Sequence, residues 1–405
     1  MKILLLTQYY PPETGAPQNR LSALARHLKM LGEDVEVLTA MPNYPAMRIF
    51  PGYEKRWYTR EVVDGIKVHR AWIYVTGSKS IVPRLMNYFS FVFSSAWIGL
   101  SKLPRYDVVI CESPPLFLGM SAWLMSRFRK AKMVFNVSDL WPESAEKLGL
   151  VTNPVILKLA TWLEEGLYKS SWKVSGQTQG IVSDIVRRFP KKDIYLFRNG
   201  VDTSAYQDIH SDASWRSDIG LDKDCFVAVY AGIIGHAQGL DVILDAGKSL
   251  SSEKKIAFVL VGSGPEKDRL QERIRKEQIG NVHILDARSR AQVIGLISGC
   301  DAAVIPLKKQ DLFLGAIPSK IFEALALKKP ILLGVDGEAR TLFIEEGKSG
   351  LYFEPENSDA LAKQVLALKT DPALLGQLGR QGNEFVMSRF GWDEISKGFH
   401  KWLYE

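Results

Sequence analysis

Short apolar runs alternate along the chain with longer stretches in which apolar residues recur at helical spacing, as in 16–31 and 154–168. Continuous Val, Ile and Leu runs separated by helices are typical of parallel strands that are covered on both faces. The first half therefore predicts a parallel sheet with helices on either side. Its predicted strands are 2–7, 34–39, 107–111, 132–137, 172–176 and 194–196.

The same alternation returns in the second half, with predicted strands at 226–231, 256–261, 282–285, 302–305 and 330–334. Each half is then expected to be a doubly wound α/β unit. The boundary is expected within the polar, turn-rich stretch 199–223, which gives one domain over 1–200 and another over 201–389. The aromatic tail, 390–405, is expected to cross back to the first domain. Because ligands of open α/β folds bind at the carboxyl ends of strands, the two domains are expected to face a central cleft.

Composition narrows the class of protein without choosing its function. The 405 residues are 46% apolar and 24% charged, which is ordinary for a globular protein. The net charge of +7 favours anionic partners, whether a nucleotide, a nucleic acid or an acidic membrane surface. Cys111, Cys225 and Cys300 are too far apart in sequence to suggest a disulfide framework or a thiolate metal site. The first apolar run is too short for a signal peptide and is interpreted as a buried strand.

Two short motifs suggest other chemistries but fail on spacing. Gly-Lys-Ser occurs at 247–249 and 347–349, yet a phosphate-binding P-loop needs an earlier Gly where this chain has Val242 and Leu342. A lone Asp-x-Asp at 222–224 does not establish a metal site. Neither a P-loop NTPase nor a bound metal is therefore predicted.

Six local patterns, in this order and spacing, resemble glycosyltransferase family 4 and, within it, the WbuB-like group of surface-polysaccharide enzymes. The resemblance covers nearly the whole chain. It implies a GT-B fold of two Rossmann-like domains, a nucleoside-diphosphate sugar donor and retaining transfer. Because the sequence shows no convincing metal cluster, the transfer is expected to need no metal or other cofactor. The patterns are YYPPETGAPQNR at 9–20, SDLWPES at 138–144, RNGVD at 198–202, YAGIIGHAQGL at 230–240, VGSGPEKDRL at 261–270 and IPSKIFEALALKKP at 317–330.

Glycine-rich turns after two predicted strands are candidate donor sites. Gly15 lies in a strand-to-helix turn, which in similar enzymes contacts the donor, although an ordinary turn is the alternative. Gly235 lies in a loop whose backbone N–H groups can meet a phosphate. Many relatives carry Arg and Lys in that loop, whereas this chain offers His236 and Gln238 as neutral donors of hydrogen bonds. For His236, a surface side chain without a ligand is the alternative.

The segment 316–327 carries the strongest single candidate site. Pro318 and Ser319 are typical of a helix start, with Ser319 as the N-cap. Lys320 then lies in the first turn, where a cation opposes the helix dipole unless an anion such as a diphosphate binds there. The resemblance implies that Glu323 holds the ribose hydroxyls; an exposed Lys–Glu pair is the alternative. Family members have an earlier Glu whose carboxylate faces the sugar ring. Eight positions before Glu323 this chain has Gly315, so that carboxylate is missing.

The remaining candidates lie at three other predicted strand ends. Asp139 follows a buried strand and is expected to orient an acceptor hydroxyl, with Glu143 assisting, or else only to cap the next helix. Trp141 is expected to shape the acceptor pocket. Arg198 is a further donor candidate, and Arg288, with Arg290 close by, lies where the family holds the base. A plain polar loop around Arg288 is the alternative.

An uncharged stretch at 85–100 is too short to span a bilayer, which takes about 20 residues. It is expected either to dip into a membrane surface or to pack inside the protein. The membrane interpretation assigns apolar contacts and basic flanks to the following residues: Leu85, Met86, Phe89, Phe91, Phe93, Trp97, Arg84, Lys102 and Arg105.

The resemblance implies an enzyme at the cytoplasmic, inner face of the plasma membrane. The donor is expected to be UDP-linked, with a UDP-N-acetyl-deoxyhexosamine such as UDP-L-FucNAc as an example. The acceptor is expected to be a polyprenyl-diphosphate-linked sugar of O-antigen or capsule biosynthesis, with no nucleic-acid partner. A UDP-sugar 2-epimerase-like enzyme and a non-catalytic nucleotide-binding module remain as alternatives.

Overall fold

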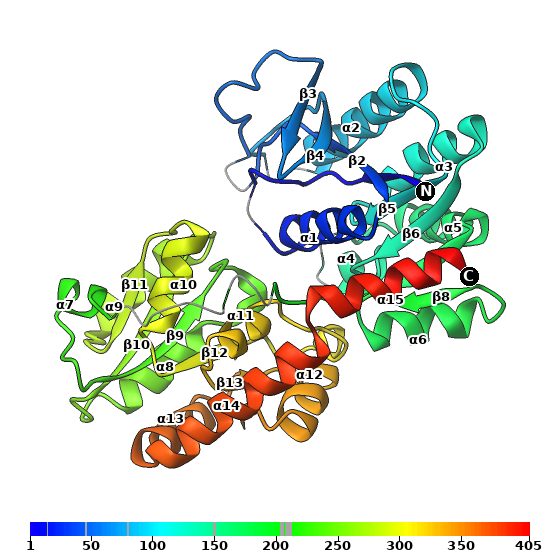
Figure 1. Ribbon diagram of the computed structural model, residues 1–405. Helices are drawn as coiled ribbons and strands as arrows, with labels where there is room; N and C mark the ends of the chain where they lie inside the picture. Colours follow the sequence, from blue (N-terminus) through cyan, green and yellow to red (C-terminus); the bar gives the residue numbers. More distant parts are fainter. Residues whose placement is uncertain are drawn as a thin grey trace. The chain divides into compact units, whose positions relative to one another are not determined.

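The chain forms two compact α/β units (Figure 1). The computed structural model describes residues 1–13, 15–44, 47–78, 81–147, 149, 151–202, 206 and 213–405. The first unit is Met1–Asn199 together with Trp392–Glu405, and the second is Gly200–Gly391. The domain boundary predicted within 199–223 lies partly outside the described residues, since 203–205 and 207–212 are not among them.

The first unit is built on an eight-stranded sheet of order β3-β4-β2-β1-β5-β6-β7-β8. All neighbouring strands are parallel except the β3–β4 pair, which is antiparallel. The strands are β1 Lys2–Leu6, β2 Asp34–Ala40, β3 Tyr58–Val63, β4 Ile66–Ala71, β5 Val108–Ser113, β6 Lys132–Val137, β7 Lys173–Gly176 and β8 Ile194–Leu196. The helices are α1 Ala16–Met30, α2 Ile81–Ser101, α3 Leu118–Arg129, α4 Glu143–Lys147, α5 Pro154–Ser170, α6 Gln179–Arg188 and α15 Trp392–Tyr404.

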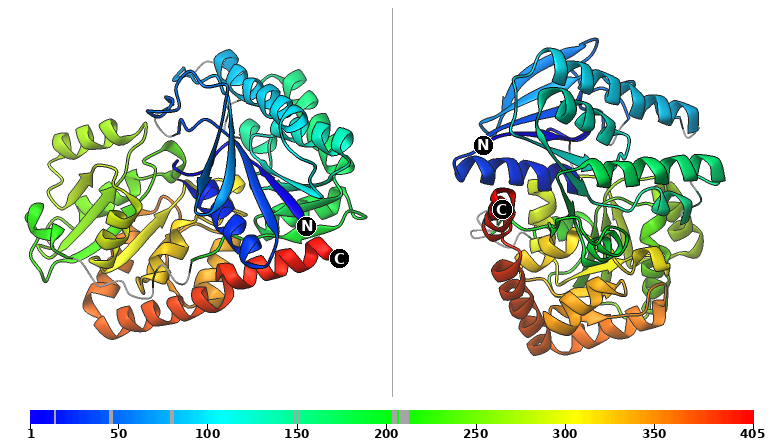
Figure 2. Two further views of the ribbon diagram at one scale, coloured as in Figure 1. Left: turned by 45° about the horizontal axis from the view of Figure 1, so that its top comes forward. Right: turned by 90° about the vertical axis from the view of Figure 1, so that its right-hand side faces the viewer.

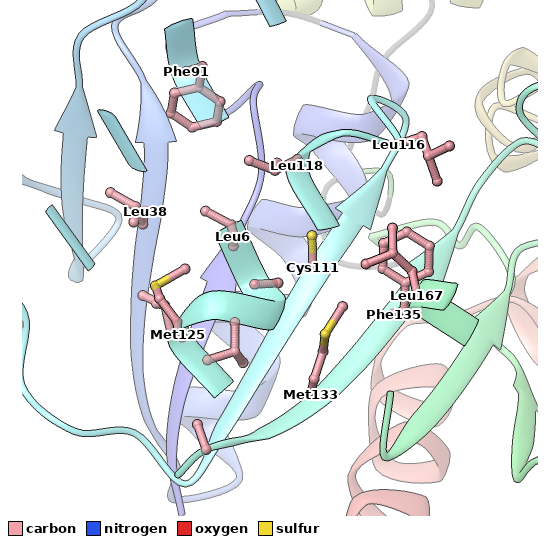
Figure 3. Close-up of a cluster of buried hydrophobic side chains, with 14 of the residues drawn as sticks. Leu6, Leu38, Phe91, Cys111, Leu116, Leu118, Met125, Met133, Phe135 and Leu167 are labelled. Carbon is pink, nitrogen blue, oxygen red and sulfur yellow. The ribbon is translucent and has the colours of Figure 1, made fainter. Parts of the chain in front are cut away.

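Two apolar layers cover this sheet, one on each face. On one face, residues of α2, α3 and α5 pack on the strands, and Figure 3 shows Phe91 and Met125 beside Leu6 and Leu38. On the other face, α1 and the last helix α15 pack against each other and against β1 and β2. The strands' Val, Ile and Leu runs are therefore buried from both sides, as continuous apolar runs in a parallel sheet require.

The last helix is attached to the first unit by aromatic packing and by polar contacts. Phe399 and Trp402 pack with Tyr195 and Phe197. The indole nitrogen of Trp402 donates to Asp193 Oδ1 at 2.7 Å, and the Tyr404 hydroxyl donates to Glu33. The C-terminal segment thus completes the layer that α1 begins.

The second unit has a six-stranded, all-parallel sheet of order β11-β10-β9-β12-β13-β14. Counted from its own first strand this order is 3-2-1-4-5-6, that of doubly wound nucleotide-binding sheets. The strands are β9 Phe226–Ala231, β10 Ile256–Val261, β11 Val282–Leu285, β12 Ala302–Pro306, β13 Ile331–Gly334 and β14 Gly350–Tyr352. The helices are α7 Trp215–Asp218, α8 Asp241–Ser249, α9 Lys267–Glu277, α10 Arg290–Ser298, α11 Lys320–Ala326, α12 Glu338–Arg340, α13 Ser358–Thr370 and α14 Pro372–Arg389.

The uncharged stretch 85–100 lies within α2, which is amphipathic. Phe91 and Ile98 are completely buried against the sheet, whereas Phe93 and Trp97 are exposed. The predicted membrane contact of Phe91 is therefore wrong, because this side chain belongs to the core on the opposite side of the helix. Leu85 is half-buried.

Candidate functional site

Two loops touch backbone to backbone at the carboxyl edge of the second sheet. Gly262 and Gly264, after β10, both have a φ of +155°, and Gly232, after β9, has a φ of +144°. A Cβ atom at Gly262 would lie 1.9 Å from the carbonyl oxygen of Gly232, and one at Gly264 would lie 2.3 Å from that of Ile234. Glycine is required at these positions both for the left-handed backbone and for the close approach. The contact fixes the loop 232–240 over the strand ends.

Lys320 lies directly over this loop. Its Nζ donates to the Tyr230 hydroxyl at 3.0 Å and lies 4.4 Å from the centre of the Tyr230 ring. A Cβ atom at Gly232 would be 3.0 Å from Lys320 Nζ, so the glycine makes room for the lysine. Within the described part of the chain, Lys320 has no carboxylate at ion-pair distance. A cation held by a neutral ring and hydroxyl keeps its charge available for an anion.

The helix α11 begins at Lys320, but Ser319 does not cap it. Ser319 has helical backbone angles, φ −61° and ψ −24°, and its side chain makes no capping hydrogen bond. A capping serine needs an extended backbone to turn its hydroxyl toward the first N–H groups. Ser319 thus stands at the predicted N-cap position, but it does not form the capping hydrogen bond. The carbonyl of Pro318 instead accepts from Ile321 N at 3.1 Å. The N–H of Phe322 likewise donates to the carbonyl of Ser319 at 3.2 Å. The Lys320 side chain, rather than these two N–H groups, is therefore what this helix start offers to an anion.

Glu323 lies one turn further along α11 and is half-buried. Desolvation raises its pKa above the ordinary value for a glutamate, while the charges of Arg290 and Lys320 oppose that shift. Arg290 is the first residue of α10, whose start is marked by a capping box between Ser289 and Gln292. Arg290 is therefore the arginine whose charge acts on Glu323, and both Arg288 and Arg290 are exposed.

The predicted loop residues Gly235, His236 and Gln238 have unequal surroundings. His236 Nδ1 lies 2.8 Å from Glu266 Oε1, and the imidazole side chain is 73% exposed. A Cβ atom at Gly235 would be 2.8 Å from Gln238 Oε1, so the Gln238 side chain folds back over the glycine. Gly235 precedes a single 3-10 turn, His236–Gln238, in which the N–H of Gln238 donates to the Gly235 carbonyl at 3.3 Å. The His236 side chain already has a carboxylate partner, so it is a weaker candidate for binding an anion than the sequence suggested.

A buried network ties four strand ends of the first unit together. Arg20 of α1 forms an ion pair with Glu112 and donates to Gln177 and Asn199 at 2.8 and 3.2 Å. Its other nitrogen reaches the hydroxyl of Ser138, next to Asp139. These partners belong to β5 or follow β6, β7 and β8, so Arg20 fixes the edge on which Asp139 lies. The sequence motif at 9–20 included Arg20 but gave no sign of its distant partners.

Asp139 is a half-buried carboxylate at this edge. The Ser144 hydroxyl donates to its Oδ2 at 2.8 Å, and desolvation raises its pKa. Glu143 is exposed and pairs with Lys147 at 2.6 Å, so its carboxylate is already engaged. The Trp141 ring lies 5.3 Å from that of Phe117, which in turn lies 4.7 Å from Phe89 of α2. An aromatic row therefore leads from α2 to the segment that carries Asp139.

The other predicted positions lie at the ends of elements in both units. Gly15 precedes α1, and a Cβ atom there would meet Gln18 Oε1 at 2.5 Å. Arg198 is half-buried just after β8. Gly315, at the position of the family's earlier Glu, is half-buried and follows the short turn Asp311–Phe313, where Asp311 is exposed.

Two features are absent from the described residues. They contain no group of three or more His, Cys, Asp or Glu side chains arranged to hold a metal ion. None of the helices formed by them combines the length and the apolar character needed to cross a bilayer.

Solved structures with low sequence identity share this architecture over the whole chain. Anabaena HepE, solved with UDP and glucose, aligns with a TM-score of 0.74 at 18% identity, and the alignment covers 100% of both chains. Sucrose-phosphate synthase from Thermosynechococcus elongatus aligns with a TM-score of 0.73 at 17% identity, covering 100% of this chain and 98% of the other. The fold is therefore GT-B, with two Rossmann-like domains.

Curated relatives point to the same class. The colanic acid biosynthesis glycosyl transferase WcaI of Escherichia coli K12 is 24% identical over 375 residues, which are 90% of this chain and 91% of the relative. The lipopolysaccharide 1,2-N-acetylglucosaminetransferase of Salmonella typhimurium is 22% identical, with 83% and 93% covered. Residues 15–200 match the glycosyl transferase 4-like domain, and residues 211–385 match the glycosyl transferases group 1. The protein is thus a glycosyltransferase, whose first half belongs to the glycosyl transferase 4-like domains and whose second half belongs to glycosyl transferases group 1.

Proposed function

We propose that this glycosyltransferase moves a sugar from a UDP-linked donor to a polyprenyl-diphosphate-linked sugar, with retention of configuration and without a metal or other cofactor. The observation that carries the donor half of the proposal is Lys320, a cation without a carboxylate partner among the described residues, lying over Gly232 at the start of α11. The relatives named for colanic acid and lipopolysaccharide synthesis support a role in O-antigen or capsule assembly. The solved HepE complex with UDP supports a uridine donor.

The chemistry needs stabilisation of the leaving diphosphate. As the bond between the sugar's anomeric carbon and the diphosphate oxygen breaks, negative charge grows on that oxygen. Lys320 at the start of α11 and backbone N–H groups around Gly235 stabilise this charge. Glu323 accepts hydrogen bonds from the ribose hydroxyls, and the positive charges of Arg290 and Lys320 favour its ionised, accepting form. Pro318 and Ser319 shape the backbone beside the diphosphate, while Gly15, Arg198 and Arg288 contribute outer contacts to the donor.

Retention follows from attack on the same face that the diphosphate leaves. The acceptor hydroxyl forms the new bond to the anomeric carbon, and its proton passes to the departing diphosphate oxygen. Asp139 orients that hydroxyl, and Trp141 packs against the acceptor's sugar. Because Glu143 already pairs with Lys147, Asp139 is the carboxylate of this segment that we assign to the acceptor.

The donor sugar is the least constrained part of the proposal. Gly315 replaces the carboxylate that family members direct at the sugar ring, which favours a donor with fewer hydroxyls, such as a UDP-N-acetyl-deoxyhexosamine. Thermal stabilisation by a panel of UDP- and GDP-sugars tests this point. Stabilisation by GDP-sugars alone would contradict the uridine assignment.

Product analysis separates transfer from the two alternative functions. With a sugar-labelled donor and a polyprenyl-diphosphate-sugar acceptor, we expect the label in the lipid phase and unlabelled UDP in water. A 2-epimerase would convert the donor into its water-soluble C2 epimer even without lipid, and a binding module would leave the donor intact. Either of those results would refute the proposed transfer.

A further inference from the structure

The outer side of α2 carries a row of exposed apolar side chains. They recur every three or four residues, so they lie on one side of the helix, opposite the buried Phe91 and Ile98. Each is between 43% and 61% exposed. The row consists of Val82, Met86, Phe89, Phe93 and Trp97.

A second apolar row lies on the first turns of α5. The sequence predicted a helix here but assigned it no function. Val155, Leu159 and Trp162 follow helical spacing and are 64%, 61% and 74% exposed. With Pro154 and Lys158 they line a shallow surface pocket that is almost entirely apolar. A tryptophan that is three-quarters exposed buries little of its ring in the isolated chain, so the fold does not account for it.

Both rows belong to one layer of the first unit. Helix α3 packs against α2 on one side and against α5 on the other, and all three cover the same face of the sheet (Figures 1 and 2). Each of the three follows the carboxyl end of a strand, namely β4, β5 or β6, so all three begin at the sheet edge that carries Asp139. α3 adds two exposed side chains of its own, Trp123 and Phe128.

The exposed charged residues of this layer are mainly basic. Neither α2 nor α3 contains an acidic residue. On α5, Glu164 is buried against Tyr168 and Arg188, and Glu165 pairs with Lys169. Exposed basic side chains stand among the exposed apolar residues of α3 and α5, namely Arg127, Lys130 and Lys158. Apolar and aromatic side chains interspersed with bases match the headgroup region of an anionic bilayer.

We propose that the outer face of α2, α3 and α5, the three-helix face, docks on an anionic lipid bilayer, with the α5 row as a second anchor beside the α2 row. The inference deepens the proposed function, since it rests on a lipid-linked acceptor. Because all three helices begin at the Asp139 edge, docking holds that edge beside the bilayer. A chain of ring contacts then joins the docked face to the segment of Asp139, through Phe89, Phe117 and Trp141.

Site-specific labelling tests the insertion of each row directly. All three native cysteines are buried, so an introduced surface cysteine can be labelled selectively with a polarity-sensitive fluorophore. We expect a blue shift on phosphatidylglycerol vesicles for Trp162→Cys and Phe93→Cys. Met30→Cys is the matched control, because Met30 is 69% exposed on α1, which covers the opposite face of the sheet. Pure phosphatidylcholine vesicles should give a weaker response at all positions.

Vesicle binding by unlabelled variants measures the contribution of each row. We expect Leu159→Ser with Trp162→Ser, and separately Phe93→Ser with Trp97→Ser, each to weaken binding to anionic vesicles at least tenfold. Met30→Ser should bind like the parent protein. Melting temperatures should stay near the parent value, because the substituted side chains are mostly exposed. Raising the salt concentration should also weaken binding, since it screens the basic residues.

Three results would overturn the inference. The first is unchanged vesicle binding by the α5 variant together with no blue shift at position 162. The second is a parent chain that self-associates in sedimentation velocity and becomes monomeric in the same variants, which would make the face a contact between copies. The third is equal binding to anionic and uncharged vesicles. UDP affinity, measured in the same preparations, reports on the donor site alone, so its loss would count against the proposed function and not against docking.

Discussion

Replacing Glu323 with Gln should weaken UDP binding without weakening the fold. The carboxylate is half-buried, and desolvation raises its pKa, so its charge is not a source of folding stability. Charge-assisted hydrogen bonds to the ribose contribute about 1.5–3 kcal/mol, which corresponds to roughly 10- to 150-fold in Kd. Calorimetric titration with UDP measures this loss, and Glu272→Gln, on the exposed face of α9, is the matched control.

A ligand that lacks the ribose hydroxyls makes the test specific. The parent protein should bind 2′,3′-dideoxy-UDP about as weakly as the Glu323→Gln variant binds UDP. The variant should bind 2′,3′-dideoxy-UDP with nearly the same affinity as it binds UDP. Equal penalties for the missing hydroxyls in parent and variant would refute the ribose contact. An unchanged UDP affinity in the folded variant would refute the assignment of Glu323 to the donor site altogether.

The raised pKa of Glu323 also predicts how UDP affinity and folding stability depend on pH. UDP affinity of the parent should fall as pH decreases toward this pKa, because the protonated acid is a poorer acceptor, while Glu323→Gln should show no such fall. A group whose pKa is raised by folding stabilises the fold below its unfolded pKa, and that contribution is lost as pH rises through the folded pKa. The parent should therefore gain stability relative to Glu323→Gln on acidification. An opposite trend in paired melting curves would contradict the desolvated environment.

Three further predictions concern other parts of the site. Lys320→Met should lower kcat by about 10²- to 10³-fold, because the leaving diphosphate loses a preorganised cation, with little change in melting temperature; normal turnover would exclude the lysine from catalysis. EDTA should leave transfer intact, and activity lost in EDTA but restored by Mg²⁺ or Mn²⁺ would show that a metal takes part. Arg20→Met should destabilise the first unit by about 3–5 kcal/mol, because it leaves the Glu112 carboxylate buried without its partner. A denaturant midpoint close to that of the parent would show that Glu112 finds another partner.

Most strands were predicted because each is a continuous apolar run. Three strands lack such a run and were missed, namely β3, β4 and β14. β3 and β4 form a hairpin. β3 mixes polar and apolar residues, with Arg60 and Val62 exposed and the other residues half-buried, so no buried apolar run marks it. The Asp64-Gly65 turn between them, with φ of +50° and +75°, was the usable signal. β14 has only three residues, Gly350–Tyr352, too few for any periodicity to appear.

The candidate donor site was predicted from local patterns, and its errors are those of local reasoning. The glycine loop and the start of α11 are both marked in sequence, and Lys320 joins them in space. Whether Arg288 or Arg290 reaches Glu323 depends on where α10 begins, and Ser319 fails as a cap because of backbone angles that composition does not reveal.

Contacts between distant segments were beyond the sequence patterns. Arg20 meets Asn199 across 179 positions of the chain, so neither residue's neighbours indicate the other. The exposed rows of α2 and α5 show a similar limit. Periodicity can divide α2 into two sides, but only the sheet decides that Phe91 is buried and Phe93 exposed.

The stereochemistry of the lipid-linked product tests the central claim most directly. The measurement uses a UDP-sugar labelled with ¹³C at the anomeric carbon, the polyprenyl-diphosphate-sugar acceptor in vesicles, and the ¹H–¹³C coupling of the new linkage. The account predicts that the label appears on the lipid-linked acceptor with the anomeric configuration of the donor, and that the Lys320→Met variant slows its appearance. An inverted configuration, or label recovered as free sugar in place of lipid-linked product, would contradict retaining transfer by this protein.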